Sequence, residues 1–429
     1  MLKTLQPFQR AGSKFLQTHP HTLLADEPGL GKTVQAIDAA EALGLSKYLV
    51  VCPASVRLGW DREIRECGGV RKHWLVVSYE QAVRGQFEQI YDVLILDEGH
   101  YLKTPESQRT QAIFNNSTGI ARRAYYKWIL TGTPILNRPR ELFPVLKCLA
   151  PGFADYTFPS FAQRYCGAYF DGRRINTKGA SRLDELSGKL EGFMLRRTSD
   201  QVGLELPPIV SSLVPLELDA QSLSVIERAE EEISNREAFI STVMEDFSAL
   251  GDQASLLHAV GFAKAVPAAH FVRELLKTQN KVVVFAHHRD VVDIIAQKLL
   301  GSGIQSVKFQ GGMSDAQKAS AIRLFKEDPG IQVIIGNIKA MGTGVDGLQE
   351  IAHSCVFAEI TWVPDEIGQA IRRLRRMGQA RDRVNAYILY APGTLEEAVL
   401  GVHKAKSHVL QKLGLGMGWR TNTKEEARK

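Results

Sequence analysis

Apolar residues along this chain gather in short continuous runs, which are separated by longer stretches with helical spacing. The first group of runs comprises residues 47–52, 74–78, 92–96 and 127–131, and the second comprises residues 281–286, 331–336, 354–358 and 384–390. Runs that are apolar at every position are typical of parallel strands covered by helices on both faces. Two such groups, roughly 150 residues apart, predict an α/β fold with two parallel-sheet lobes.

The region between the two groups has a different pattern. Residues 151–200 mix Gly, Pro, aromatic and basic residues, and residues 219–250 carry apolar side chains at helical spacing among acidic ones. We therefore predict four parts of the chain. They are a first lobe at 1–150, a mainly helical insertion and linker at 151–265, a second lobe at 266–400, and a C-terminal helix with a basic tail at 401–429.

The composition narrows the class of protein. With 44% hydrophobic and 23% charged residues in 429, the chain is typical of soluble globular proteins of more than one domain. No apolar run reaches the length of a membrane span, and the N-terminus lacks a signal core. We expect no membrane association and no secretion, and a cytoplasmic or nucleoid-associated place if the source is bacterial or viral. The five cysteines form no CxxC pair, and a net charge of +6 suits a polyanion partner without proving one.

A phosphate-binding loop is the first chemical motif. The stretch ADEPGLGKT, residues 25–33, stands between an apolar run and a helical pattern. Gly29 and Gly31 let backbone N–H groups approach phosphate oxygens, and the helix N-terminus adds partial positive charge. Lys32 would reach the β- and γ-phosphates, and Thr33 would hold Mg²⁺ through its hydroxyl. Asp26 stands where the general pattern GxxxxGK[ST] has glycine.

Two carboxylates at the end of an apolar run form the second motif. In DVLILDEGH, Asp97 and Glu98 follow the strand at its carboxyl end, where ligand sites of open α/β sheets lie. Asp97 can hold Mg²⁺ and Glu98 can polarise an attacking water. An Asp-Glu pair after a strand is common, but with a phosphate loop upstream it predicts hydrolysis of Mg·ATP.

The motifs together resemble those of a known family. Their order is similar to helicase superfamily 2, specifically the Swi/Snf-like DNA translocases, and the resemblance covers residues 9 to about 397. The motifs that carry it are LQPFQ, ADEPGLGKT, VVCPASVRLGW, VVSYE, LDEGH with YLKTPESQRT, LTGTPILNRPREL, GTGVDG and QAIRRLRRMGQ. The stretches FAQRYC, MLRRTSDQV and VVVFAHH look most like the annealing-helicase branch, the replication-fork remodellers.

The resemblance implies two RecA-like lobes that close on ATP and ratchet along duplex DNA. In the ATP site it implies Gln9 as the adenine reader, Gly344 and Gln369 as further nucleotide contacts, and Arg373 and Arg376 as arginine fingers on the γ-phosphate. Two positions depart from the family. Proline at 28 replaces the usual methionine, and the aspartate at 346 replaces a neutral residue.

The resemblance also implies contacts with DNA. We expect sequence-independent binding of duplex or branched DNA by a monomer, with no base readout, because nothing resembles a recognition helix. Arg196 and Arg197 could contact the second lobe or DNA, or lie on a solvated basic face. The remaining candidates are Ser55, Ser78, Gly311, Gly312, Lys339 and Trp362, the last of which could equally be a packing residue.

The stretch QAIRRLRRMGQ, residues 369–379, raises a question about its four arginines. If the stretch is a helix, Gln369, Arg373 and Arg376 share one face. Arg372 and Arg375 then lie on a separate face, which is free for DNA or for solvent. The helical spacing therefore separates the two arginines that the resemblance assigns to ATP from a second pair, which is left for DNA or for solvent.

Three functions fit these motifs. We favour a DNA-stimulated ATPase that translocates on duplex DNA and rewinds or remodels branched DNA in replication, recombination or repair. A strand-separating helicase is the alternative within enzymes. An ATP-dependent DNA clamp or scaffold without turnover is the alternative of another class, and the presence of every catalytic position argues against it.

Overall fold

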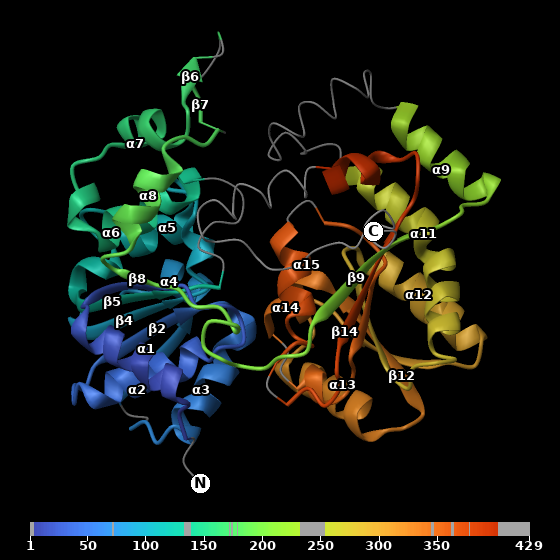
Figure 1. The fold of residues 1–429 in the computed structure, drawn as a ribbon, viewed down its shortest axis with the longest axis horizontal. Helices are drawn as coiled ribbons and strands as arrows, with labels where there is room; N and C mark the ends of the chain where they lie inside the picture. The colour runs from blue at the N-terminus through green and yellow to red at the C-terminus, as the bar shows by residue number, and fades with distance from the viewer. Residues whose placement is uncertain are drawn as a thin grey trace. The chain divides into compact units, whose positions relative to one another are not determined.

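The computed structural model describes residues 4–70, 73–132, 139–170, 172, 175–177, 179–231, 254–344, 347–361, 364–376 and 378–401. Within these residues the chain forms two compact units, the first ending at Glu205 and the second beginning at Leu206. Each unit is built on one six-stranded sheet (Figure 1).

The sheet of the first unit is entirely parallel, with the strand order β3-β2-β4-β5-β1-β8. Its strands are β1 (His21–Leu24), β2 (Tyr48–Cys52), β3 (Trp74–Ser78), β4 (Tyr91–Asp97), β5 (Ala124–Leu130) and β8 (Met194–Leu195). The strand β2 is buried at all five positions, because helices cover both of its faces.

Helices cover the two faces of this sheet with separate apolar clusters. One cluster joins the sheet to α1 (Pro7–Thr18), α2 (Lys32–Ala42) and α3 (Arg57–Glu66). The other joins it to α4 (Tyr79–Arg84), α5 (Gln108–Phe114) and α6 (Phe143–Leu149). A satellite aromatic cluster packs α7 (Phe158–Tyr165) and α8 (Leu183–Leu190) beside α6, near a short hairpin of β6 (Tyr169–Phe170) and β7 (Ile175–Asn176).

The sheet of the second unit is also entirely parallel, with the order β11-β12-β10-β13-β14-β9. Its strands are β9 (Ile209–Pro215), β10 (Val282–Ala286), β11 (Gln305–Phe309), β12 (Ile331–Asn337), β13 (Ser354–Phe357) and β14 (Val384–Tyr390). The helices are α9 (Ala220–Glu231), α11 (Ala254–Leu275), α12 (Arg289–Gly301), α13 (Asp315–Glu327), α14 (Ile338–Gly344) and α15 (Pro364–Ile371).

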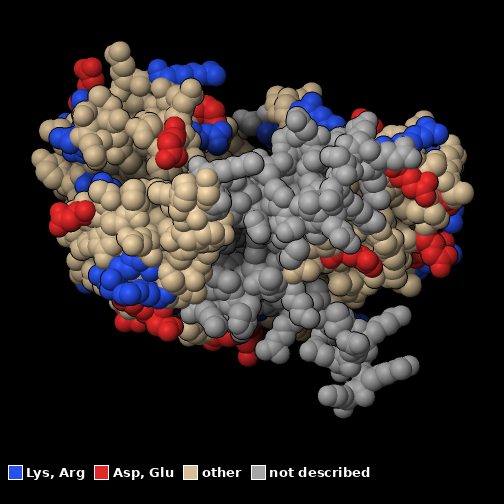
Figure 2. Space-filling view, turned by 90° about the horizontal axis from the view of Figure 1, so that it is seen from above, with Lys and Arg blue, Asp and Glu red and all other residues tan. Residues whose placement is uncertain are grey.

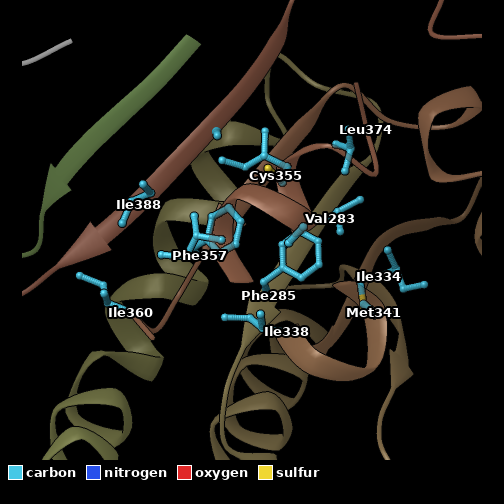
Figure 3. Close-up of a cluster of buried hydrophobic side chains, with 14 of the residues drawn as sticks. Val283, Phe285, Ile334, Ile338, Met341, Cys355, Phe357, Ile360, Leu374 and Ile388 are labelled. Atoms are coloured by element: carbon cyan, nitrogen blue, oxygen red, sulfur yellow. The ribbon is translucent and has the colours of Figure 1, made fainter. Parts of the chain in front are cut away.

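The larger core of this unit lies between the sheet and helices α13, α14 and α15. Phe285 and Phe357 stack there with ring centroids 4.9 Å apart, and Met341 and Leu374 pack near them (Figure 3). A second cluster on the opposite face joins α11 and α12 to the sheet. Apolar burial on both faces explains why the central strands β10 and β13 show no alternation of polar and apolar residues.

The two-lobe parallel architecture expected from the apolar runs is confirmed, and all eight runs fall on strands. The boundary between the units falls inside the segment 151–265 that the sequence sets apart. Its first part completes the first sheet through β8, and its later part adds β9 to the edge of the second. Of the helix expected at 219–250, α9 is present, and residues 232–253 and the tail after 401 lie outside the described residues. No helix in the described part of the chain has the length and apolarity needed to cross a membrane.

Candidate functional site

The phosphate loop leaves the first sheet after β1 and enters α2. Gly29 and Gly31 have φ values of 97° and 75°, in the left-handed region that favours glycine, and Gly31 is the N-cap of α2. The Lys32 amine curls back onto the loop and donates a hydrogen bond of 2.7 Å to the Asp26 carbonyl oxygen. The expected strand, glycine turn and helix are therefore present, with Lys32 and Thr33 in the first turn of α2.

Gln9 lies against this loop from helix α1. Its amide nitrogen donates to the Leu30 carbonyl oxygen at 3.3 Å, and its amide oxygen accepts from the Gln6 backbone N–H at 2.9 Å. Gln9 is 5% exposed, and a Cβ added to Gly31 would lie 2.5 Å from its amide nitrogen. The residue expected to read adenine thus packs on the glycine of the phosphate loop.

Asp97 ends strand β4 and is held from three sides. Its Oδ2 accepts from Trp60 Nε1 at 2.7 Å, its Oδ1 accepts from the Glu98 backbone N–H at 2.9 Å, and its carbonyl oxygen accepts from the Tyr79 hydroxyl at 2.8 Å. Glu98 then turns out of the sheet with a φ of 52°, one of two non-glycine residues with positive φ in the described chain. His100 Nδ1 lies 3.2 Å from Glu98 Oε2. Uncommon backbone conformations of this kind gather at functional sites.

The charge of Asp97 depends on its surroundings. Burial and the neighbouring Glu98 carboxylate raise its pKa to about 6, while the Trp60 hydrogen bond and the Lys32 charge act in the opposite direction. A carboxylate that is costly to ionise gains from a cation placed beside it. Asp97 is therefore suited to a divalent cation.

The residues present fit a Mg²⁺-nucleotide. Among the described residues no cluster of three or more His, Cys, Asp or Glu could hold a metal by itself. Mg²⁺ usually binds through one or two protein oxygens and keeps water and substrate phosphates as its other ligands, which suits Asp97 and Thr33. Leu24 and Asp97 both pair in register with Leu130 of β5, so the phosphate loop and the carboxylates leave the sheet at the same level.

Gly132, in the motif LTGT, lies against the loop. The Thr131 N–H donates to the Leu24 carbonyl oxygen at 3.1 Å, and a Cβ added to Gly132 would lie 2.5 Å from Pro28 Cγ. Proline at position 28, unusual for the resembled family, thus packs on the chain that follows β5. Residues 133–138 of that motif lie outside the described residues.

Sequence reasoning missed the partners that fix the carboxylates and the loop. The stretches that carry the resemblance contain Trp60, Tyr79 and Arg197, and Gln35 follows the phosphate loop in α2. Their spacing does not show which group each one bonds, because the bonds join separate elements of the fold. One signal was present, because a buried acid such as Asp26 directly after a strand requires a cation nearby. The expectation that Arg197 contacts the second lobe, DNA or solvent is wrong, since its guanidinium binds Asp26 inside the first unit.

The structure corrects the prediction that residues 369–379 form one helix. Helix α15 ends at Ile371, and the chain then tightens: the N–H groups of Arg373 and Leu374 bond to carbonyls three residues earlier, at 3.1 and 3.0 Å. Spacing of 100° per residue no longer applies in such turns. Gln369 alone of the expected ATP face is helical, and Arg373 and Arg376 are half-buried in the turns that follow.

The separate arginine face expected for DNA or solvent is wrong for Arg372, which the structure buries, and stays a prediction for Arg375. Arg372 is only 3% exposed, and its guanidinium lies against Gly368, where an added Cβ would be 3.1 Å from Nη2. Arg375 is half-buried and donates from Nε to the Pro207 carbonyl oxygen at 2.9 Å, beside β9. Both side chains therefore make contacts within the second unit.

The DNA candidates are unequal in exposure. Ser78 is 5% exposed, and its Oγ caps α4 by accepting from the Gln81 N–H at 3.2 Å, so a structural role accounts for it. Gly311 and Gly312 are exposed, with Arg289 Nη2 donating to the Gly311 carbonyl oxygen at 2.8 Å.

Ser55 is half-buried in a short 3₁₀ turn and Lys339 is exposed, while Gly344 ends α14. Trp362 and the aspartate at 346 lie outside the described residues. On the face seen in Figure 2, the described Lys and Arg side chains are interspersed with Asp and Glu and form no single basic patch.

Comparison with known proteins extends these observations. The model of the SNF2-related domain matches residues 72–260, and that of the helicase conserved C-terminal domain matches residues 267–378. The DNA annealing helicase and endonuclease ZRANB3 of Bos taurus is 30% identical over 444 residues, which cover 94% of this chain and 40% of that protein.

A second relative is the SWI/SNF-related matrix-associated actin-dependent regulator of chromatin subfamily A-like protein 1 of Xenopus tropicalis, which is 30% identical over 437 residues. The alignment covers 96% of this chain and 45% of the relative, so the chain spans less than half the length of these two proteins. The SWI2/SNF2 ATPase core of Sulfolobus solfataricus in complex with dsDNA aligns over 99% of this chain and 96% of its own, with 21% identity and a TM-score of 0.43.

The two domain matches follow one another in the order of the two units, and the sequence relatives cover nearly the whole chain. The chain belongs to the Swi/Snf-like family of helicase superfamily 2, on its annealing-helicase branch.

Proposed function

We propose that this chain is a DNA-stimulated ATPase that translocates on duplex DNA and rewinds or remodels branched DNA. The observation that carries the proposal is the common level at which the phosphate loop and Asp97 leave the first sheet, on either side of β5. This arrangement brings a phosphate-binding turn and a metal-binding carboxylate to one edge, as nucleotide hydrolysis requires.

The roles of the residues follow from their chemistry. Bound Mg²⁺ would neutralise charge on the phosphates, with Asp97 and Thr33 as its protein ligands. Lys32 offsets phosphate charge, and the N–H groups of Gly29 and Gly31 give directed donors. Glu98, which turns out of the sheet with a positive φ just after β4, would orient a water and accept its proton.

The family assigns Arg373 and Arg376 the stabilisation of charge that develops on the γ-phosphate. Gln9 is assigned the adenine, and Gln369 and Gly344 further nucleotide contacts. These assignments are part of the proposal, as are DNA contacts at Ser55, Gly311, Gly312 and Lys339.

The relatives favour translocation with rewinding over strand separation, because one of them is named a DNA annealing helicase. A non-hydrolysing clamp is disfavoured, since Lys32, Asp97 and Glu98 lie together at one sheet edge with the geometry described above.

Turnover of ATP with and without duplex DNA tests the enzyme directly. Lys32→Ala should lose nucleotide binding, whereas Glu98→Gln should still bind nucleotide and lose turnover by roughly 10²–10⁴-fold, because general-base catalysis contributes that much. Glu66→Gln is the matched control, since Glu66 is an exposed carboxylate on α3 that lies 3.8 Å from Arg62. Wild-type turnover in Glu98→Gln would show that Glu98 is not the group that accepts the proton of the attacking water.

A further inference from the structure

Asp26 is the first residue of the phosphate loop to differ from the general pattern, and it is fully buried. A buried carboxylate is costly unless a cation and hydrogen bonds compensate it. Arg197 supplies both, since its Nε donates to Asp26 Oδ1 at 3.0 Å and its Nη2 donates to Oδ2. This bidentate geometry fixes the orientation of the carboxylate as well as its charge.

The same guanidinium joins two further elements, the helices α1 and α2. Arg197 Nη1 donates to the Phe8 carbonyl oxygen of α1 at 2.6 Å, and Nη2 donates to Gln35 Oε1 of α2 at 2.9 Å. Gln35 Nε2 in turn donates to Asp26 Oδ2 and to the Leu30 carbonyl oxygen, both at 3.1 Å. The loop is thereby held at its start and near its end by one connected network.

The space around this network is tightly filled. A Cβ added to Gly12 of α1 would lie 1.8 Å from Gln35 Oε1 and 2.6 Å from Arg197 Nη2. Only glycine permits this approach, and the Arg197 side chain is 15% exposed. The arrangement leaves the guanidinium little freedom to move away from Asp26.

The backbone beside Arg197 also binds the loop. The segment Met194–Ser199, here called the strap, begins with β8 and continues alongside the loop. The Ala25 N–H donates to the Leu195 carbonyl oxygen at 2.7 Å, and the Glu27 N–H donates to the Arg197 carbonyl oxygen at 2.9 Å. The Ser199 N–H and hydroxyl both donate to Glu27 Oε2, at 2.7 and 2.9 Å. Residues 25, 26 and 27 of the loop are each bonded to the strap.

We propose that Arg197 is a positioning residue of the nucleotide site, which holds the phosphate loop in its binding conformation through Asp26. The proposal rests on the proposed function, because it takes the loop to be the site where nucleotide binds. The Lys32 amine donates to the Asp26 carbonyl oxygen, so a shift of Asp26 displaces the backbone acceptor that orients the catalytic lysine. Nucleotide affinity should therefore depend on a side chain that does not touch nucleotide.

The test is a titration of fluorescent ADP and ATP, read beside thermal unfolding. Arg197→Met keeps the length of the side chain and removes the guanidinium, and it should weaken nucleotide binding about 10- to 100-fold, since small misplacements cost that much. The KM for ATP should rise by more than kcat falls. Arg197→Lys should recover part of the affinity, because it restores the charge without the bidentate fork.

Two further variants separate positioning from stability. The double variant Asp26→Asn with Arg197→Met removes both charges, so it should fold with stability closer to wild type and still bind nucleotide weakly. Arg164→Met is the matched control, because Arg164 makes a bidentate pair with Glu185 at 2.9 and 2.8 Å in the same unit. It should leave nucleotide affinity unchanged.

The outcomes are distinct. Wild-type affinity in the double variant, or an equal loss in Arg164→Met, would overturn the positioning role. Failure of the wild-type chain to bind nucleotide would overturn both proposals. A wild-type chain that binds nucleotide without turning it over would remove the enzymatic function and leave the role of Arg197 intact.

Discussion

Single residues at the edge of the first sheet show how a catalytic carboxylate is prepared. Asp97 ends strand β4 after four buried apolar residues, and three hydrogen bonds from Trp60, Tyr79 and its own neighbour hold it. The indole N–H satisfies one carboxyl oxygen, and the Glu98 N–H satisfies the other. The carboxylate is therefore oriented before any cation reaches it, which lowers the cost of binding.

Trp60→Phe tests this orientation. The change keeps the ring in the core and removes the N–H, so it should raise the Mg²⁺ concentration needed for half-maximal ATP turnover and destabilise the first unit by about 1.5–3 kcal/mol. Trp74→Phe is the control, because Trp74 Nε1 donates to the Glu41 carboxylate at 2.6 Å away from the phosphate loop. An equal shift in Mg²⁺ requirement for both variants would show that Trp60 acts only through stability.

The buried cysteines give a second prediction at this scale. Cys52, Cys166 and Cys355 are buried, and burial raises the pKa of each thiol; for Cys166 it reaches about 12. Thiolate is the reactive form, so these three should resist alkylation by iodoacetamide at pH 8 in the folded protein and react after denaturation. Mass spectrometry of the labelled peptides gives the answer, and rapid labelling of Cys355 in the native protein would contradict the core packing.

The helices and strands of this fold differ in how well their own residues predict them. Strands such as β10 could be predicted because their apolar runs reflect burial on both faces. The two-residue β8 and the edge strands β9 and β11 could not, since β8 depends on pairing with a distant strand and β11 is exposed at two of its five positions. The motif residues of the site were predictable from local spacing, whereas Trp60 and Arg197 act across long sequence separations that no local pattern shows.

Helix α15 illustrates the same limit. The sequence after Ile371 keeps apolar spacing, but three-residue turns replace the helix and bury Arg372. Arg372→Ala should therefore lower stability by on the order of 2 kcal/mol or more, because it empties a packed site.

The salt dependence of DNA binding distinguishes this role from a DNA contact. Arg372→Ala should leave the slope of log affinity against log salt unchanged, since a buried guanidinium releases no counterions from DNA. Arg383→Ala, at an exposed arginine before β14, controls for the loss of charge. If Arg372→Ala had wild-type stability and a salt slope reduced by about one, Arg372 would be a DNA contact and not a buried packing residue.

At the scale of the whole molecule, two parallel-sheet units share one chain, and the phosphate loop and its carboxylates lie in the first unit. The proposed arginine fingers, Arg373 and Arg376, lie in the second. A net charge of +6 suits the proposed binding of DNA through contacts with its phosphates. Affinity that is independent of DNA sequence follows from such contacts.

Arg376→Ala tests the assignment of the fingers. At saturating DNA it should lower ATP turnover by roughly 10³-fold or more, the contribution of such arginines in related chemistry, and change nucleotide affinity far less. Stopped-flow turnover and nucleotide titration on the same preparation measure both quantities. A large loss of affinity with unchanged maximal turnover would assign Arg376 to binding.

The most direct measurement of the central claim is displacement of a third strand from duplex DNA, run beside unwinding of a forked duplex. A translocase on duplex DNA should remove the third strand only with ATP, should fail to do so with Glu98→Gln, and should leave the forked duplex paired. Efficient unwinding of the fork would make the protein a strand-separating helicase. ATP turnover without third-strand removal would contradict translocation itself.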